Sequence, residues 1–479
     1  RSNQNQVLAT WNQGNRRPIV TKNYANKDAM FDNYAYPGGG SVLHMLRKHL
    51  GDELFFKSLN RYLTDNAHQP VQTEQLRIAI EQTTGQSMDW FFDQWLYKMG
   101  HPVFEVTKSY DASKKQLTMN VKQTQKVDPN NEFPQTEFFR AYVDVEIDGN
   151  VQRVMIEPKA ENVFNFASAT EPKLVNFDYE GALLKEMKFD KSVDELVYQM
   201  NNDKDIIGRR WAIGELSKAA KNAQTSAADK SKILAAFSAK VTSDPSYLIR
   251  RAAIAEVRGI VVPRQANPLD ESKVTIDDAA SQSLIKAAKD ENSLVRADAI
   301  GLLGTTKDAK YVDLYLSAVN DRSYSVIDNA AEALGYTKNA KAYDALIKLA
   351  NTPSWKGRIA AAGFKGIGAL EDKRGLDLSF KTVADKTQPA NVRTAALGVI
   401  ASAGKGDNRA FPLIFESFKT SLDANDFNGI FGSLQSIVKI ADPRGQQAFD
   451  LLKAKFKDNQ RIMGFANFLE TQFKAALSK

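Results

Sequence analysis

Cysteine is absent from this chain of 479 residues, so neither disulfide bonds nor thiol chemistry contributes to its fold or activity. Histidine is scarce as well, and no two of the four histidines are four residues apart with a glutamate directly after the first: His44, His49, His68 and His101. That spacing is what places two histidines and a general base on one face of a metal-binding helix. The sequence therefore predicts that the chain by itself forms no four-coordinate zinc site.

Long apolar runs are also missing. No stretch approaches the roughly 18 apolar residues of a membrane-spanning helix, and the first residues, 1–6 (RSNQNQ), lack the apolar segment of a signal peptide. The 64 basic and 57 acidic side chains leave a net charge of only +7, which favours solubility more than it indicates a partner. We therefore expect neither membrane insertion nor a nucleic-acid partner. The compartment stays open, with export to a periplasmic or extracellular space slightly favoured over the cytoplasm.

The length suggests about three domains, and the hydrophobic periodicity changes twice along the chain. From about residue 27 to 100 the pattern is helical, with Val42, Leu46 and Leu50 four residues apart and with glycines where helices should stop, at Gly51 and Gly85. Four short helices cannot bury these apolar faces alone, so we expect them to pack on another part of the protein. We assign residues 1–100 to this first domain.

After residue 100 the period changes to two. Val143 and Val145 alternate with polar neighbours such as Asp144 and Glu146, and residues 148–150 (DGN) indicate a tight hairpin turn. About seven short strands separated by turn signals predict a small β-sandwich over residues 101–185.

The remainder, 186–479, is helical again and repeats itself. A frame that ends in alanine recurs at intervals of 41, 46, 31, 31 and 35 residues, with its marker at Ala212, Ala253, Ala299, Ala330, Ala361 and Ala396. Small residues at the marker let paired helices approach closely, and a recurring unit of two helices is typical of a HEAT-like α-solenoid. Paired arginines, at 209–210 and 250–251, offer a candidate basic ridge, but acidic residues interleave with them throughout.

The chemistry of the chain is concentrated in residues 36–46 (YPGGGSVLHML), where a tyrosine precedes a glycine-rich turn and an apolar helix. A phenol keeps its proton at neutral pH, so it can donate a hydrogen bond to a developing oxyanion where water is excluded. From the residues alone, Tyr36 and Tyr34 are equally good candidates for such a donor, and packing is the more ordinary role for either of them.

This segment resembles the Y-x-K-G-A-x-V-L-x-M-L segment of the aminopeptidase N family of zinc peptidases, which are gluzincins. The resemblance continues in order through residues 30–32 (MFD), 50–55 (LGDELF), 91–95 (FFDQW), 100–102 (GHP), 123–125 (QTQ) and 139–140 (FR). The family's His-Glu-x-x-His signature is absent. Gly38 stands where the family usually has lysine, which puts the local geometry in doubt but leaves the Tyr36 hydroxyl in place.

The resemblance implies a multidomain, mainly α fold: the helical C-terminal part of a thermolysin-like catalytic domain, a small β-sandwich and a HEAT-like solenoid that encloses the active site. It implies Tyr36 as the catalytic, oxyanion-stabilising residue, zinc as the cofactor of the parent enzyme with its ligands outside this chain, and peptides as substrates. The missing N-terminal and zinc-binding domains are then expected partners. Because the first residue is Arg1 and only 35 residues precede Tyr36, we expect a processed or truncated piece that is inactive alone. The alternative is a non-catalytic sandwich-plus-solenoid scaffold that binds proteins.

Overall fold

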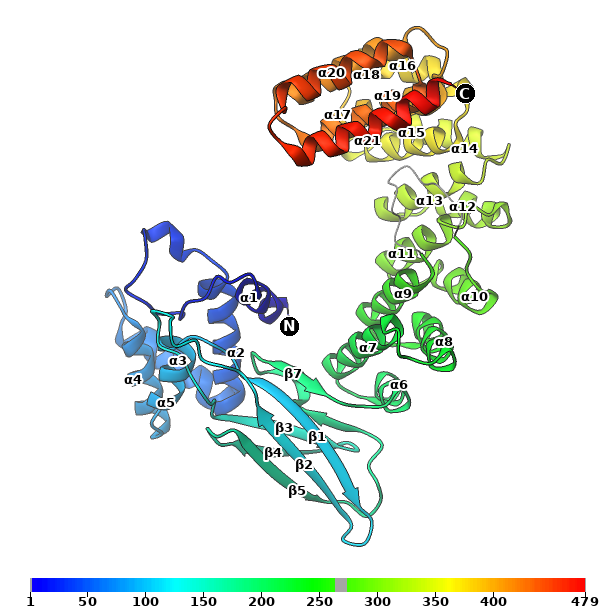
Figure 1. Ribbon diagram of the computed structural model, residues 1–479. Helices are drawn as coiled ribbons and strands as arrows, with labels where there is room; N and C mark the ends of the chain where they lie inside the picture. The colour runs from blue at the N-terminus through cyan, green and yellow to red at the C-terminus, as the bar shows by residue number, and fades with distance from the viewer. Residues whose placement is uncertain (1, 263–273, 479) are drawn as a thin grey trace. The chain divides into compact units, whose positions relative to one another are not determined.

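The computed structural model describes residues 2–262 and 274–478, and its contacts divide the chain into two compact units, Arg1–Asn222 and Ala223–Lys479 (Figure 1). The first unit combines helices with two small β-sheets, whereas the described residues of the second unit form helices. The expected boundaries at residues 100 and 185 are finer than this division, and they remain a prediction.

The first unit begins with a run of short helices. They are α1 (Ser2–Asn12), the 3₁₀ turn η1 (Lys27–Met30), the π turn η2 (Tyr34–Gly38), α2 (Gly39–Leu50), α3 (Asp52–Asp65), α4 (Thr73–Thr84), α5 (Asp89–Phe92) and the π turn η3 (Asp93–Tyr97). Gly51 and Gly85 follow α2 and α4 with φ angles of 78° and 70°, which side chains other than glycine rarely adopt. The predicted helix ends at these two glycines are confirmed.

The helix α1 lies before residue 27, where the sequence pattern gave no helix. Its buried face consists of Gln4, Val7 and Thr10, so two of the three positions are polar and the apolar periodicity is hidden. The Gln4 amide donates hydrogen bonds of 3.1 and 3.0 Å to the carbonyl oxygens of Gly181 and Ala182. Tertiary hydrogen bonds therefore keep this face of α1 packed on the rest of the unit, which hydrophobic burial alone would not do.

Seven strands follow, in two sheets. A four-stranded sheet has the order β5-β2-β1-β7 and a three-stranded sheet the order β4-β3-β6. Only the β1–β7 pair is parallel, and the other neighbours are antiparallel. The strands are β1 (Val103–Asp111), β2 (Gln116–Gln123), β3 (Ala141–Ile147), β4 (Asn150–Ile156), β5 (Glu161–Ala167), β6 (Val175–Phe177) and β7 (Glu186–Phe189). The last strand lies beyond residue 185, where the strand region was expected to end.

The hairpin between β3 and β4 turns where the sequence predicted. Asp148 and Gly149 have φ angles of 46° and 89°, the two consecutive positive values that a tight right-twisting hairpin requires. The turn fixes the register Val143↔Val154. Glu146, one of the polar residues that alternate with the valines of this strand, is nevertheless buried and only 2% exposed.

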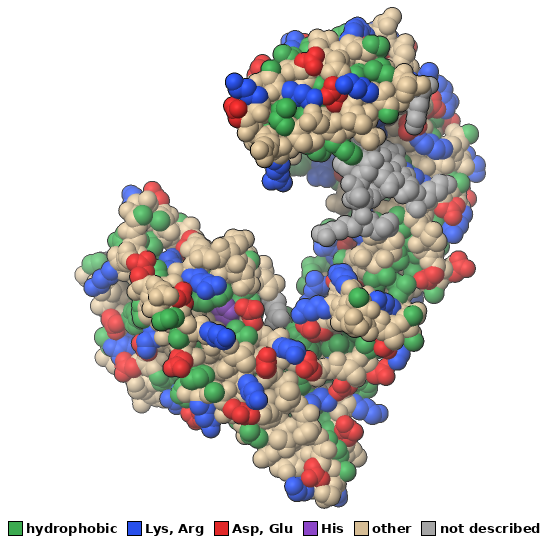
Figure 2. Space-filling model, viewed as in Figure 1, with side chains coloured by type: hydrophobic (Ala, Val, Ile, Leu, Met, Phe, Trp, Pro, Cys, Tyr) green, Lys and Arg blue, Asp and Glu red, His purple; other side chains and the backbone are tan. Residues whose placement is uncertain are grey.

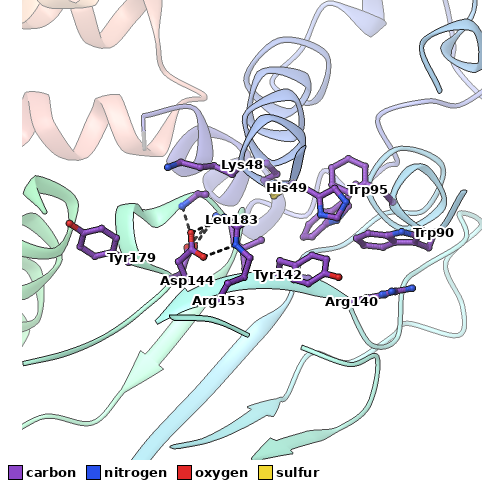
Figure 3. A pocket seen from close by; sticks show the side chains of 15 residues that line it. Lys48, His49, Trp90, Trp95, Arg140, Tyr142, Asp144, Arg153, Tyr179 and Leu183 are labelled. Atoms are coloured by element: carbon purple, nitrogen blue, oxygen red, sulfur yellow. Dashed lines mark hydrogen bonds and ion pairs between the residues drawn. The ribbon is translucent and has the colours of Figure 1, made fainter. Parts of the chain in front are cut away.

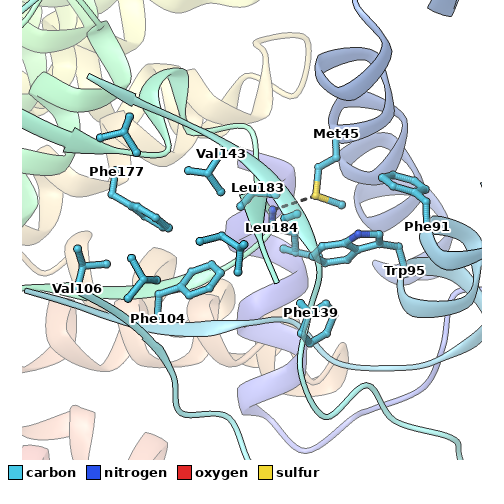
Figure 4. Close-up of a cluster of buried hydrophobic side chains, with 14 of the residues drawn as sticks. Met45, Phe91, Trp95, Phe104, Val106, Phe139, Val143, Phe177, Leu183 and Leu184 are labelled. Carbon is cyan, nitrogen blue, oxygen red and sulfur yellow. Dashed lines mark hydrogen bonds between the residues drawn. The ribbon is translucent and has the colours of Figure 1, made fainter. Parts of the chain in front are cut away.

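One hydrophobic core joins the helices to the sheets (Figure 4). Trp95 lies 4.8 Å from Phe139, ring centre to ring centre, and Phe104 of β1 meets Phe177 of β6 at 5.3 Å, so the core also joins the two sheets. The backbone N–H of Leu184 is 3.3 Å from the Met45 sulfur. Helices that cannot bury their faces alone are thus buried against the sheets.

Three further helical elements complete the first unit: η4 (Tyr179–Gly181), α6 (Val193–Asn202) and α7 (Ile206–Lys221). Beneath them lies a buried polar network in which the Asn176 amide donates to the carboxylates of Glu146, at 2.6 Å, and Asp203, at 2.7 Å. Burial, and then the neighbouring charge of Asp203, raises the pKa of Glu146. The two carboxylates share one amide because Glu146 pairs across the sheet with Asn176 of β6, and Asp203, directly after α6, reaches the same amide.

The second unit is built from helical hairpins. Its helices are α8 (Ala227–Ser243), α9 (Tyr247–Val261), α10 (Asp278–Ala287), α11 (Ser293–Gly304), α12 (Val312–Ala318), α13 (Tyr324–Tyr336), α14 (Ala342–Ala350), α15 (Arg358–Leu370), α16 (Leu376–Ala384), α17 (Ala390–Ala403), α18 (Ala410–Asp423), α19 (Phe427–Ile440), α20 (Gln446–Lys455) and α21 (Gln460–Leu477), with short 3₁₀ turns η5 (Ala309–Tyr311), η6 (Trp355–Gly357), η7 (Lys373–Gly375) and η8 (Pro443–Gly445). The odd-numbered helices from α9 to α21 pack in a continuous row, and even-numbered helices such as α14 and α16 pack on them.

None of the helices in the described ranges is both long and apolar enough to cross a lipid bilayer.

The marker alanines explain the close packing of the row. All six are buried, and they lie on every second helix from α7 to α17: Ala212, Ala253, Ala299, Ala330, Ala361 and Ala396. A Cβ atom added at Gly335 of α13 would lie 2.1 Å from the carbonyl oxygen of Gly366 on α15. Only small side chains permit this approach between neighbouring helices.

Two arginines of the repeat, Arg250 and Arg296, brace neighbouring helical hairpins. Arg250 is 5% exposed, donates to the carbonyl oxygen of Asp244 at 2.9 Å, and pairs with the Asp290 carboxylate at 2.8 Å. Arg296 repeats this pattern one step later with the Asp290 carbonyl and the Asp321 carboxylate, each at 2.8 Å. Figure 2 shows acidic and basic side chains interspersed over the visible face of each unit. The charges of Arg250 and Arg296 are therefore neutralised within the fold, whereas Arg210 is exposed.

We predict that Glu146→Gln flattens the pH dependence of stability in the first unit. A glutamate whose folded pKa is raised favours folding at low pH, and this contribution is lost as pH rises from the unfolded pKa, about 4.3, through the raised folded value. The variant should therefore gain melting temperature relative to the unaltered chain at pH 7.5, and little or none at pH 4. Tryptophan fluorescence reports mainly this unit, which holds four of the five tryptophans: Trp11, Trp90, Trp95 and Trp211.

Glu105→Gln is the matched control, because Glu105 is exposed on β1 and the same change there removes no buried charge. Equal pH profiles for Glu146→Gln and the unaltered chain would contradict the assignment of the buried carboxylate.

Candidate active-site surface around Tyr36

Tyr36 sits in η2, a single π turn that runs directly into α2. Pro37 lies inside this turn and has no backbone N–H to donate, which favours a departure from regular α-helical hydrogen bonding. The Gly38 N–H bonds instead to the carbonyl oxygen of Asn33, five residues earlier, at 2.9 Å. The local widening of the helix therefore follows from the sequence at this position.

The structure separates the two candidate tyrosines. The Tyr34 side chain is 4% exposed and its hydroxyl donates a 2.6 Å hydrogen bond to the carbonyl oxygen of Asn15. Burial raises the pKa of the Tyr34 phenol to about 12. Tyr36 is 65% exposed and its ring stacks on that of Phe31, itself 69% exposed, at 6.1 Å between ring centres. Tyr34 is therefore a packing residue, and the Tyr36 hydroxyl is accessible to a substrate.

Arg17 and Asp32 hold the turn that carries both tyrosines. The Asp32 carboxylate accepts the backbone N–H groups of Tyr34, at 2.9 Å, and of Ala35, at 3.0 Å. Arg17 binds the same carboxylate through two nitrogens, at 3.0 and 2.8 Å, and its guanidinium lies 5.4 Å from the Tyr34 ring centre. Sequence reasoning assigned neither residue a role. The available signal was an aspartate two residues before the start of a helical turn, the usual pattern of a carboxylate that caps backbone N–H groups.

The glycines after Tyr36 bring the backbone close to neighbouring segments. A Cβ atom at Gly38 would lie 3.4 Å from the Asn33 carbonyl oxygen and 3.5 Å from Ile19, whereas at Gly39 it would meet nothing within 4 Å. Gly38 is buried, so the position where the related segment usually carries lysine faces the interior here. The surface beside the Tyr36 hydroxyl therefore has no lysine at that position.

Two of the histidines, His101 and His49, are held by contacts within the first unit. His101 is buried, and its Nε2 is 2.9 Å from the Glu186 carboxylate, while the His49 ring lies among Trp90, Phe91 and Tyr142. Across the described parts of the chain, no three side chains of the metal-binding types cluster closely enough to hold a metal ion. The residues present therefore do not fit a zinc ion.

Comparison with known proteins gives a family match over the region that contains Tyr36. Residues 2–95 match the family model described as the peptidase family M1 domain, and residues 281–365 match the HEAT repeat model. Aminopeptidase M1 of Arabidopsis thaliana is 37% identical over 85 residues, covering 18% of this chain and 10% of that protein. Tricorn protease-interacting factor F2 of Thermoplasma volcanium is 30% identical over 105 residues, covering 22% of this chain and 13% of that protein.

Among solved structures, aminopeptidase A of Legionella pneumophila in complex with aspartic acid aligns with a TM-score of 0.50 at 14% sequence identity. The alignment covers 96% of this chain and 58% of that one. At this level of identity the match shows a shared fold. The chain thus spans little more than half of the solved aminopeptidase, and its aligned segments span about a tenth of these curated relatives.

We predict that the two tyrosines differ in their contribution to stability. Tyr34→Phe removes a buried hydrogen bond and leaves the Asn15 carbonyl oxygen without its donor, which should lower the free energy of unfolding by about 1 kcal/mol. Tyr36→Phe alters an exposed hydroxyl and should change it by less than about 0.5 kcal/mol. Urea denaturation followed by tryptophan fluorescence measures both. Equal losses in the two variants would contradict the separate roles.

Proposed function

We propose that this chain, which is related to the aminopeptidase N-like M1 metallopeptidases, is the C-terminal part of a zinc-dependent aminopeptidase that removes N-terminal residues from peptides. The observation that carries the proposal is the match of residues 2–95 to the M1 family model, which includes the Tyr36 segment. The relatives and the shared fold support a peptidase-family role.

Within this proposal Tyr36 supplies one hydrogen bond to the oxyanion of the tetrahedral intermediate. Its exposure supports the role, because a catalytic phenol must reach a substrate, and the buried Tyr34 hydroxyl is already bonded to Asn15. The Asp32 and Arg17 contacts restrain the turn, so the phenol is presented from a fixed backbone. Zinc, the cofactor of the proposed parent enzyme, would be held by residues outside this chain.

The finer domain assignments belong to the same proposal. We propose that α2 to η3 form the helical C-terminal part of a thermolysin-like domain, that the two sheets form its following β-sandwich, and that the helical hairpins form a HEAT-like solenoid. The shared core of the two sheets and the HEAT repeat match of residues 281–365 support the last two assignments. The alternative of a non-catalytic scaffold is not favoured, because the M1 match includes the Tyr36 segment.

We expect the chain by itself to bind no stoichiometric zinc and to show negligible hydrolysis of aminoacyl arylamides, because its described residues contain no metal-binding cluster. Metal analysis of the purified chain and a chromogenic arylamide assay measure these two properties. Turnover that is abolished by a chelator would contradict the proposed division of the active site between this chain and another segment.

In a longer product in which a His-Glu-x-x-His segment precedes Arg1, Tyr36→Phe should lower kcat by about 10² to 10³-fold, since one oxyanion hydrogen bond is lost. KM and zinc content should change little. Tyr198→Phe serves as the matched control, because Tyr198 is 36% exposed on α6, outside the proposed site. A preceding segment without His-Glu-x-x-His, or full activity of Tyr36→Phe, would count against the enzyme and in favour of the scaffold.

A further inference from the structure

A second candidate site lies in the first unit, in a small cavity between α2, α5 and the edge of β3 (Figure 3). Its enclosed volume is about 30 Å³. A single water needs roughly 10 to 15 Å³ measured in this way, so there is room for about two oxygen atoms but not for a whole ligand. A group with two oxygens could enter while the rest of its molecule remained outside.

The cavity wall is aromatic. The His49 ring centre lies 5.5 Å from that of Trp90, 6.3 Å from Phe91 and 5.2 Å from Tyr142. Burial, and then the charges of Arg153 and Arg140, lower the pKa of the His49 imidazole. The aromatic wall is therefore uncharged at neutral pH. The positive charge of the cavity comes from the arginines around this wall. Small-molecule sites commonly combine such apolar walls with a few polar groups.

Of the three cations that line the cavity, Lys48, Arg140 and Arg153, only Arg140 has no carboxylate partner among the described residues. Gln94 fixes its backbone with hydrogen bonds of 3.0 and 2.6 Å, and its guanidinium lies 4.7 Å from the Trp90 ring centre. Its Nε atom is buried and has no hydrogen-bond acceptor among the described residues. Within those residues Arg140 forms no ion pair either. A buried donor without an acceptor is unfavourable, and an anion in the cavity could supply the missing acceptor.

The other charges of the cavity are paired. Arg153 binds the Asp144 carboxylate at 2.8 and 3.1 Å through two nitrogens, as the dashed lines in Figure 3 mark. Lys48 pairs with Glu180, and Asp178 pairs with Lys185. Arg140 therefore leaves the cavity with one excess positive charge. Guanidinium groups prefer planar, two-oxygen anions.

We propose that this cavity binds the carboxylate group of a small acid or an acidic peptide, with Arg140 as its principal cation and the His49, Trp90 and Tyr142 rings as its wall. The volume admits a carboxylate, and the aromatic rings and Arg140 line the same cavity, so an apolar wall and a cation would both contact it. The inference concerns a site separate from Tyr36, and it does not depend on the proposed peptidase function.

The chain itself provides the reporter, because it has only four histidines and their imidazole proton resonances can be resolved by NMR. Acetate should shift the His49 resonance in a saturable way and raise the His49 pKa, since the bound anion offsets the two arginine charges. Arg140→Gln should weaken acetate binding by at least about tenfold. In the absence of acetate it should itself raise the His49 pKa, which verifies that the pocket is still folded.

Arg47→Gln is the matched control. Arg47 lies two residues before His49 on α2 but pairs with Asp52 at 2.8 Å, outside the cavity, so acetate binding should be unchanged. Arg140→Lys keeps the charge but loses the planar guanidinium, so this variant should bind acetate with intermediate strength. It also provides a test if Arg140→Gln fails to fold.

Two further arms identify the ligand. The peptide acetyl-Ala-Asp-Ala-amide should act like acetate if peptide acids are the source, and its Asn analogue should not bind. Acetate binding without peptide binding restricts the site to small free acids. An equal shift with sodium chloride at the same ionic strength, stronger binding of inorganic phosphate than of acetate, or unchanged binding in both Arg140 variants would overturn the proposal.

Discussion

The first unit depends on the hydrophobic contact between its short helices and its sheets. Trp95 and Phe91 on the helical side meet Phe139 and Leu183 on the other, and no element of this unit has enough apolar surface to form a core alone. This contact orients α2, and α2 in turn continues the π turn that carries Tyr36. It also brings His49 and Trp90 against β3, which creates the Arg140 cavity.

Local chemistry then distinguishes residues that look alike in the sequence. Tyr34 and Tyr36 differ in position by two residues, yet the turn between them directs one phenol to the Asn15 carbonyl oxygen and leaves the other exposed. Arg250 and Arg140 also look alike in the sequence but have different partners in the fold. The first is neutralised by Asp290 and braces two helical hairpins, whereas the second is held by Gln94 and Trp90 without a carboxylate. Charge counts along the chain therefore say little about which cations are available.

Buried polar groups account for the places where the sequence pattern was misleading. Glu146 occupies a polar position of the alternating pattern, but it is buried beside Asn176 of the neighbouring strand β6, whose amide also donates to Asp203 directly after α6. The helix α1 is hidden from hydrophobic periodicity because Gln4 fills a core position through hydrogen bonds to η4 and the residue after it. In both cases the hydrogen-bonded groups are far apart along the chain. Gln4 bonds to Gly181, and Asn176 bonds to Asp203, which is 27 residues away.

The sequence by itself determined the alternation of helical, strand and repeat patterns, the helix ends at Gly51 and Gly85, the Asp148-Gly149 hairpin and the alanine frame of the repeats. These features follow from backbone conformations and periodicities that are set within a few residues. The resemblance of residues 36–46 added Tyr36 as a candidate, but not the reason why Tyr34 is unsuitable. Only the tertiary structure decided which tyrosine is accessible, which carboxylate is buried and which arginine lacks a counter-ion, because each depends on groups that long-range packing brings together.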